Sequence, residues 1–218
     1  MCFSATVSFV SGASLCIFGV ATVKLIKKRS ELPFAMIPLL FGVQQLVEGM
    51  LWLSFIYEAP LLNQVMTYLF TLFSHVLWPI YVPFSIYLIE SVAWRRKVLR
   101  VFQVIGASVG LYLLYSIIRY PVISEIDEHM VYVLPYVREH PVMDLYLLST
   151  CFAPLVSSHN FVRLFGVLTF LLFFVALWFY SVALFSVWCF FSAVLSLLIY
   201  LHFKVKKMPT VLGVQLNS

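Results

Sequence analysis

LFGVLTFLLFFVALWFYSVALFSVWCFFSAVLSLLIYL, residues 164–201, runs without a single charged side chain. One α-helix of this length would extend about 57 Å, whereas the hydrocarbon core of a bilayer is about 30 Å thick. The stretch therefore predicts two membrane-spanning helices joined by a tight turn, which we place near Tyr180–Ser181.

The rest of the chain has the same character. Of its 218 residues, 63% are hydrophobic and 11% are charged, and the net charge is +5. Soluble domains average about 45–50% apolar and about 25% charged residues. The composition therefore excludes a soluble globular domain, a disordered chain and a nucleic-acid-binding protein. It predicts an all-α polytopic membrane bundle.

Seven apolar segments are candidates for crossing a bilayer, at roughly 20 residues per crossing. The fifth is the weakest, because it is short and contains Asp144 and Pro154. The seven predicted transmembrane helices cover 7–25, 33–56, 64–89, 101–118, 142–158, 161–180 and 182–203. We expect residues 1–207 to form one seven-helix domain, with an outer loop at about 119–141 and a short cytoplasmic tail at 208–218.

The basic residues predict the orientation. With seven crossings, all but Arg119 and Arg138 of the 14 lysines and arginines fall on one side of the membrane. Cytoplasmic loops are enriched in Lys and Arg. We therefore expect the N-terminus outside and the C-terminus in the cytoplasm, in the cytoplasmic (inner) membrane. The basic residues on the shared side are Lys24, Lys27, Lys28, Arg29, Arg95, Arg96, Lys97, Arg100, Arg163, Lys204, Lys206 and Lys207.

Two stripes of small residues predict close helix packing. One repeats every fourth residue, and the other is a G-x-x-x-G pair. Packing inside the bundle and contact between copies both remain open, so a homo-oligomer is an alternative. The stripes are Ser4, Ser8, Gly12 and Cys16, and then Gly106 and Gly110.

Several runs together resemble a known family. They are MCFSA at 1–5, FGVQQLVEGMLWL at 41–53, HVLWP at 75–79, VSSHN at 156–160 followed by FG at 165–166, and SVWCFFSAVLSLLIYLHF at 186–203. They are similar to an uncharacterised family of small bacterial multi-pass integral membrane proteins beginning Met-Cys-Phe-Ser-Ala. The resemblance covers nearly the whole chain. It implies a small multi-pass membrane protein and implies no activity or catalytic residue.

The second predicted helix carries the strongest chemical signal. Gln44, Gln45 and Glu48 lie within a run from Leu32 to Tyr57 that has no other charge. Residues three or four apart share one flank of a helix, and an ionisable group at membrane depth normally faces the bundle interior or water. We interpret the three as a polar ligand-binding site; a hydrogen-bonded clamp between helices is the structural alternative.

The third predicted helix adds His75, followed by Pro79 and Pro83. Proline lacks the N–H that would bond the carbonyl of His75, so we expect a kink with a free carbonyl beside the imidazole. Counting about 1.5 Å per residue, His75 lies at nearly the same depth as Gln44 and Gln45. A histidine bonded to a neighbouring helix is the alternative.

Two further histidine groups lie at the membrane boundaries. His159 precedes the sixth predicted helix and His202 ends the seventh, so both can face the same inner mouth. His129 and His140 lie among acidic residues on the outer side, where a solvated loop is the better interpretation. The possible cofactor is a metal ion, held by His75 with Glu48 or by His159 with His202.

Three hypotheses of function follow. The leading one is a transporter-like or sensor module that binds a small molecule or ion at Gln44, Gln45, Glu48 and His75. The second is an intramembrane metal-assisted hydrolase or transferase acting on lipid. The third is a structural or assembly partner of another membrane protein. The expected partners are the lipid bilayer and a small-molecule or lipid ligand, without nucleic acid.

Overall fold

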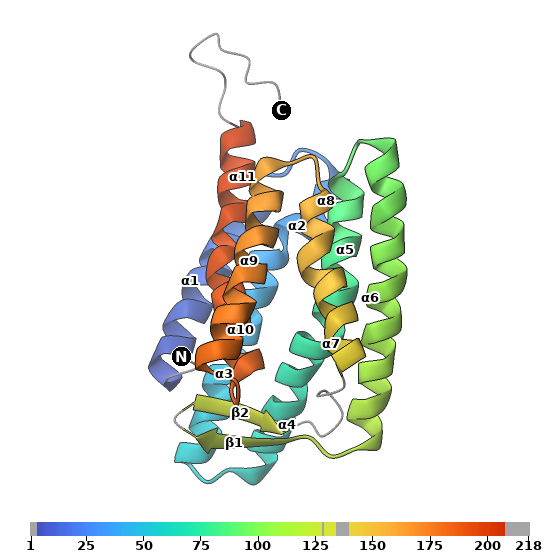
Figure 1. The fold of residues 1–218 in the computed structure, drawn as a ribbon. Helices are drawn as coiled ribbons and strands as arrows, with labels where there is room; N and C mark the ends of the chain where they lie inside the picture. Colours follow the sequence, from blue (N-terminus) through green and yellow to red (C-terminus); the bar gives the residue numbers. More distant parts are fainter. Residues whose placement is uncertain (1–3, 128, 134–139, 208–218) are drawn as a thin grey trace.

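The computed structural model describes residues 4–127, 129–133 and 140–207, and it is a bundle of upright helices with a small hairpin at one end (Figure 1). Several helices are divided into consecutive segments by local changes in winding. The elements are α1 (Ala5–Val23), η1 (Arg29–Glu31), α2 (Leu32–Ala35), α3 (Ile37–Ile56), α4 (Pro60–Thr71), η2 (Leu72–Leu77), α5 (Trp78–Ile89), α6 (Ala93–Arg119), β1 (Ile123–Asp127), β2 (His129–Val133), α7 (His140–Leu147), η3 (Leu148–Phe152), α8 (Ala153–Val156), α9 (Asn160–Phe179), α10 (Leu184–Leu195) and α11 (Leu197–Lys207).

Six helices of the described chain are long and apolar enough to cross a membrane. They cover Ala5–Val23, Arg29–Ile56, Pro60–Ile89, Ala93–Arg119, Asn160–Phe179 and Leu184–Lys207. The predicted fifth crossing is a shorter apolar helix, Pro141–Val156, which would extend only about 24 Å. The turn predicted near Tyr180–Ser181 is confirmed, because α9 ends at Phe179 and α10 begins at Leu184.

The outer segment contains an antiparallel hairpin, which the all-α prediction did not include. In it, Ile123 pairs with Val133 and Asp127 pairs with His129. Met130, Val131 and Tyr132 are buried, and Tyr132 stacks on Phe70 of α4 with 4.3 Å between ring centroids. The hairpin therefore closes one end of the bundle (Figure 1). The predicted tail at 208–218 lies outside the described residues.

Small residues bring neighbouring helices into contact, which confirms the use of both stripes inside the bundle. An added Cβ at Gly12 would lie 2.9 Å from the Leu46 side chain of α3. On α6, a Cβ at Gly106 would overlap the carbonyl oxygen of Pro79, and one at Gly110 would lie 2.7 Å from Ile80. A side chain at Gly106 would require a backbone shift, whereas at Gly12 and Gly110 the nearest atoms belong to side chains that would have to move. The small residues thus allow α1 to lie close to α3 and α6 close to α5.

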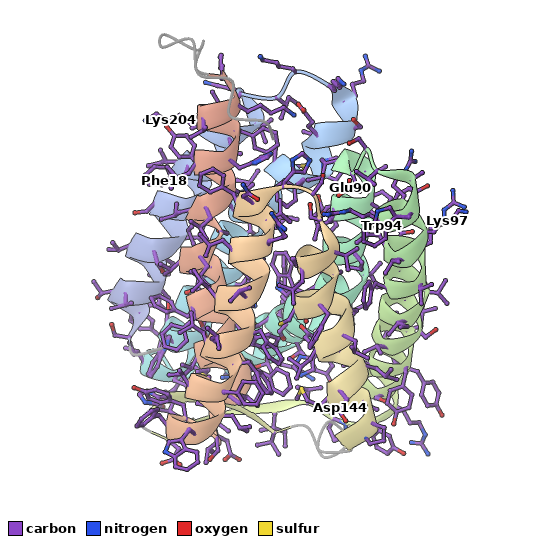
Figure 2. The ribbon with its side chains drawn as sticks, turned by 45° about the horizontal axis from the view of Figure 1, so that its top comes forward. Phe18, Glu90, Trp94, Lys97, Asp144 and Lys204 are labelled. Atoms are coloured by element: carbon purple, nitrogen blue, oxygen red, sulfur yellow. The ribbon has the colours of Figure 1, made fainter. Side chains whose placement is uncertain are left out.

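The two ends of the bundle differ in charge. The α1–η1 connection and the first turns of α6 and α9 lie at the end where α11 finishes, opposite the hairpin (Figure 1). Lys97, Lys204 and Glu90 lie at this end, whereas Asp144 lies near the other (Figure 2). The basic clusters predicted to share one side are therefore at one end of the described bundle; we call it the basic end.

Candidate functional site

Helix α3 carries the polar group. After Pro38 the sequence of this helix is almost entirely apolar. The polar residues Gln44, Gln45 and Glu48 within it are all fully buried. Gln45 Nε2 donates to Glu48 Oε2 at 3.4 Å, and Ser11 of α1 donates to Gln45 Oε1 at 3.4 Å. The three side chains therefore lie inside the bundle, as helical spacing predicts.

Helix α10 provides a close partner for Glu48. Ser186 Oγ donates to Glu48 Oε1 at 2.5 Å, and Ser186 is itself fully buried. The thiol of Cys189 lies one turn further along the same helix, beside both Gln44 and Glu48. The sequence analysis did not identify Ser186, because a serine within an uncharged run looks like any other small packing residue.

His75 lies in a π-helical segment, η2, between α4 and α5. Its Nδ1 lies 2.7 Å from Ser74 Oγ, and its ring packs against Phe185 with 4.2 Å between centroids. The Nε2 atom is buried and has no hydrogen-bond partner among the described residues. A buried polar atom of this kind is costly unless water or a ligand completes it.

The carbonyl of Ser74, one residue before His75, is bonded from another helix. In a π-turn, the N–H of residue i bonds the carbonyl of residue i−5, so the N–H missing at Pro79 leaves the carbonyl of Ser74 without its helical partner. The hydroxyl of Tyr146 on α7 donates to this carbonyl. Our expectation of a free carbonyl at His75 stays a prediction; the π-helical register adds the carbonyl of Ser74, which the Tyr146 hydroxyl binds.

Glu48 and His75 lie at one level of the bundle. Trp78 Nε1 donates to Gln44 Oε1 at 2.7 Å, which fixes the register between antiparallel α3 and α5. One turn from that bond toward the hairpin end lie Glu48 on α3 and His75 on η2. Consecutive residues of α10 confirm the level, because Phe185 contacts His75 and Ser186 contacts Glu48.

A small cavity lies toward the basic end from this level, and neither Glu48 nor His75 lines it. Its volume is about 30 Å³, and its lining includes Trp78, Tyr146, Thr169, Cys189 and Ser192. That volume accommodates a water molecule or a small ion. Thr169 Oγ1 is buried without a hydrogen-bond partner among the described residues, so the cavity has at least one polar group in its wall that an occupant would complete.

His159 and His202 meet at the basic end, as the sequence analysis expected. Their ring centroids are 5.0 Å apart, and His159 Nε2 lies 3.4 Å from the carbonyl oxygen of Ile89. Next to them, Glu90 Oε2 accepts from the N–H of Ser158 at 2.7 Å, and Glu90 Oε1 accepts from Val92 at 2.9 Å.

The pKa of Glu90 reflects these contacts. Burial alone would raise the pKa, but the hydrogen bonds from Val92 and Ser158 outweigh burial and hold the pKa of Glu90 below its usual value. An ionised Glu90 thus ties the start of α6 to the turn before α9. Its role at this position is to hold the chain together.

Neither of the two predicted metal sites has a third ligand among the described residues. Nowhere in the described ranges do three His, Cys, Asp or Glu side chains gather as metal ligands would. On the outer side, His129 packs against Tyr180 with 5.1 Å between ring centroids, and the side chain of His140 lies outside what the structure describes. The pairs His75–Glu48 and His159–His202 therefore stay predictions as metal sites.

Comparison with known proteins places the chain in a family. A family of unknown function (DUF6629) matches residues 1–213. The chain belongs to this family. The prediction of an uncharacterised family is thereby confirmed. No curated protein and no solved structure matches the chain.

Proposed function

We propose that this protein is a multi-pass protein of the cytoplasmic (inner) membrane that binds a small ion or a proton at Gln44, Gln45, Glu48 and His75. The observation that carries the proposal is the burial of the Glu48 carboxyl group, with its oxygens bonded by Ser186 and Gln45. Placing a charge at the bilayer centre costs about 2.5–3.5 kcal/mol on insertion scales. An ionisable group at this depth therefore supports a functional role.

The chemistry of the site favours a small, oxygen-binding species. The carboxylate of Glu48 and the hydroxyl of Ser186 are oxygen ligands that hard cations prefer, while Gln45 presents its amide N–H to the Glu48 carboxyl group. The cavity of about 30 Å³ is lined by Trp78 and Cys189 and not by Glu48 or Ser186 themselves, and it has room for a water-sized occupant and not for an organic molecule. We therefore narrow the predicted ligand from a small molecule or ion to an ion or proton, as in a transporter-like or sensor module.

The distribution of side chains supports the orientation that we propose, with the N-terminus outside. Trp178 is 85% exposed near the hairpin end, and Trp94 is 59% exposed at the basic end. Aromatic residues of this kind mark the two interfaces of a membrane, and Lys and Arg mark its cytoplasmic side. The basic end then faces the cytoplasm, and the shorter helix Pro141–Val156 is the seventh membrane crossing in this proposal.

Thermal unfolding in detergent tests the proposal. The protein is heated in NaCl, LiCl or choline chloride at equal ionic strength, and infrared difference spectra across a pH series follow the carboxyl band. We expect the small cations to raise the midpoint of wild-type unfolding relative to choline, or the carboxyl band to titrate. Both responses should disappear in Glu48→Gln.

The matched control is Glu90→Gln. It makes the same substitution at a second buried glutamate, which lies at the basic end and away from Glu48, and it should keep the wild-type response. If Glu48→Gln does not fold, Ser186→Ala keeps the carboxyl group and should weaken the response. An identical response in wild-type and Glu48→Gln, or no response in the wild-type protein, would overturn the proposal.

A further inference from the structure

Two arginines of α6 converge on one tyrosine at the end of α5. Arg96 Nη2 donates to the hydroxyl oxygen of Tyr87 at 3.1 Å, and Arg100 donates to the same oxygen from Nη2 at 3.0 Å and from Nε at 3.3 Å. The two guanidinium groups also lie 4.8 and 5.5 Å from the centre of the Tyr87 ring. Both positive charges are thus held close together at the basic end.

This arrangement leaves positive charge and hydrogen-bond donors uncompensated. A guanidinium has five N–H donors, and the neutral Tyr87 hydroxyl uses one from Arg96 and two from Arg100. Neither arginine forms an ion pair with a carboxylate in the part of the chain that the structure describes. Two adjacent like charges repel, so an anion between them is the natural partner, and guanidinium groups match phosphate geometry well.

The surroundings identify the source of that anion. Phe84 lies one turn before Tyr87 on α5 and is 42% exposed, and Val104 lies one turn after Arg100 on α6 and is 67% exposed. Both project from membrane-spanning segments one turn deeper than the arginines. Trp94 and Lys97 lie at the same end of the bundle (Figure 2). A charged cluster therefore sits directly above exposed apolar surface.

We propose that Tyr87, Arg96 and Arg100 bind the phosphate of an anionic phospholipid whose acyl chains lie against Phe84 and Val104. The arginines recognise the phosphate oxygens, and the Tyr87 hydroxyl fixes the separation of the two guanidinium groups. The apolar side chains below require a ligand with a hydrocarbon part. This lipid site is separate from the buried site at Glu48 and does not depend on it.

Native mass spectrometry of the full chain in neutral detergent tests the proposal. The protein is titrated with phosphatidylglycerol and, in parallel, with phosphatidylcholine. We expect wild-type protein to bind phosphatidylglycerol more tightly. The double variant Arg96→Gln/Arg100→Gln should weaken that binding about tenfold or more, because two basic contacts to an anionic lipid are lost. Tyr87→Phe keeps both charges and the ring, and should weaken binding by a smaller factor.

The matched control is Lys204→Gln/Lys207→Gln, which removes the same charge from the same end of the bundle. This variant should bind phosphatidylglycerol as wild-type does. An equal loss in the control would show non-specific attraction to a basic surface and would overturn the proposal. Binding of inorganic phosphate or glycerol phosphate as tightly as the lipid would also overturn it, in favour of a soluble anion. If the arginine variant does not fold, Tyr87→Phe decides: unchanged binding contradicts a positioned phosphate site.

Discussion

The hydrogen bond between Ser186 and Glu48 offers a quantitative test of the buried site. The Oγ–Oε1 distance is 2.5 Å and both residues are fully buried. An O–H···O⁻ bond of about 2.5–2.7 Å is typical of a charge-assisted pair. Such bonds contribute about 1.5–3 kcal/mol, against about 0.5–1.5 kcal/mol for neutral pairs. Interhelical hydrogen bonds measured inside a membrane average only about 0.6 kcal/mol, with a maximum near 1.7 kcal/mol.

A double-mutant cycle measures this bond. The four proteins are wild-type, Ser186→Ala, Glu48→Gln and the double variant, and their free energies of unfolding come from SDS titration in mixed micelles. We expect Ser186→Ala to lower the free energy of unfolding by about 1–2 kcal/mol, since it removes a donor and little volume. The coupling energy should be about 1 kcal/mol or more, at the upper end of the membrane range.

A second double-mutant cycle, on a bond between two neutral side chains, gives a coupling energy for comparison. Asn63 Nδ2 donates to Ser54 Oγ at 3.1 Å, a longer bond between neutral groups. The cycle between Ser54→Ala and Asn63→Ala should give a coupling energy of about 0.5 kcal/mol or less. If the Ser186–Glu48 cycle is additive to within about 0.5 kcal/mol, the bond does not hold the carboxyl group, and the reasoning about the site is refuted.

Two further predictions concern helix packing and the buried carboxylate at the basic end. Gly106→Ala should lower the free energy of unfolding by about 1–3 kcal/mol, because its Cβ would overlap the carbonyl of Pro79. Gly49→Ala should cost less in the same SDS titration, because its Cβ would lie 3.1 Å from the ring of Phe9, which can rotate; equal costs would contradict the packing argument. Glu90 has a lowered pKa in the folded protein, so its contribution to stability is present above the unfolded pKa of about 4.3 and is lost as the pH falls through the folded pKa. Unfolding midpoints measured across that acid range should therefore decline less in Glu90→Gln than in wild-type, and parallel curves would contradict a stabilising, ionised Glu90.

Much of the architecture could be predicted from the cost of moving charge into lipid. The charge-free stretch 164–201 required a turn, and the structure has it between Phe179 and Leu184. The same cost predicted that Gln44, Gln45 and Glu48 turn inward. These inferences depend only on the average polarity of a segment and on helical periodicity, which a single sequence displays directly.

The hairpin and the π-helical segments could not be predicted in this way. The hairpin buries Met130 and Tyr132 against the end of the bundle, and this surface exists only after the helices have assembled. Pro79 indicates which backbone N–H is missing, but the register that the preceding turn adopts depends on neighbours such as Tyr146. Likewise, nothing distinguishes Ser186 from Ser192 or Ser196 until α10 has been placed against α3.

The position of His75 depends on three helices together. Irregular backbone at membrane depth persists only where protein groups satisfy it, and here the hydroxyl of Tyr146 bonds the carbonyl of Ser74. Tyr146 precedes the second π-helical segment, η3, whose Ser149 Cβ would lie 3.2 Å from a Cβ at Gly106. Gly106 thus lies between Pro79, near the start of α5, and η3, and it lets α6 approach both. Since π-turns are frequent at functional sites, the simplest account of two adjacent ones is that they hold the imidazole of His75 at the level of Glu48.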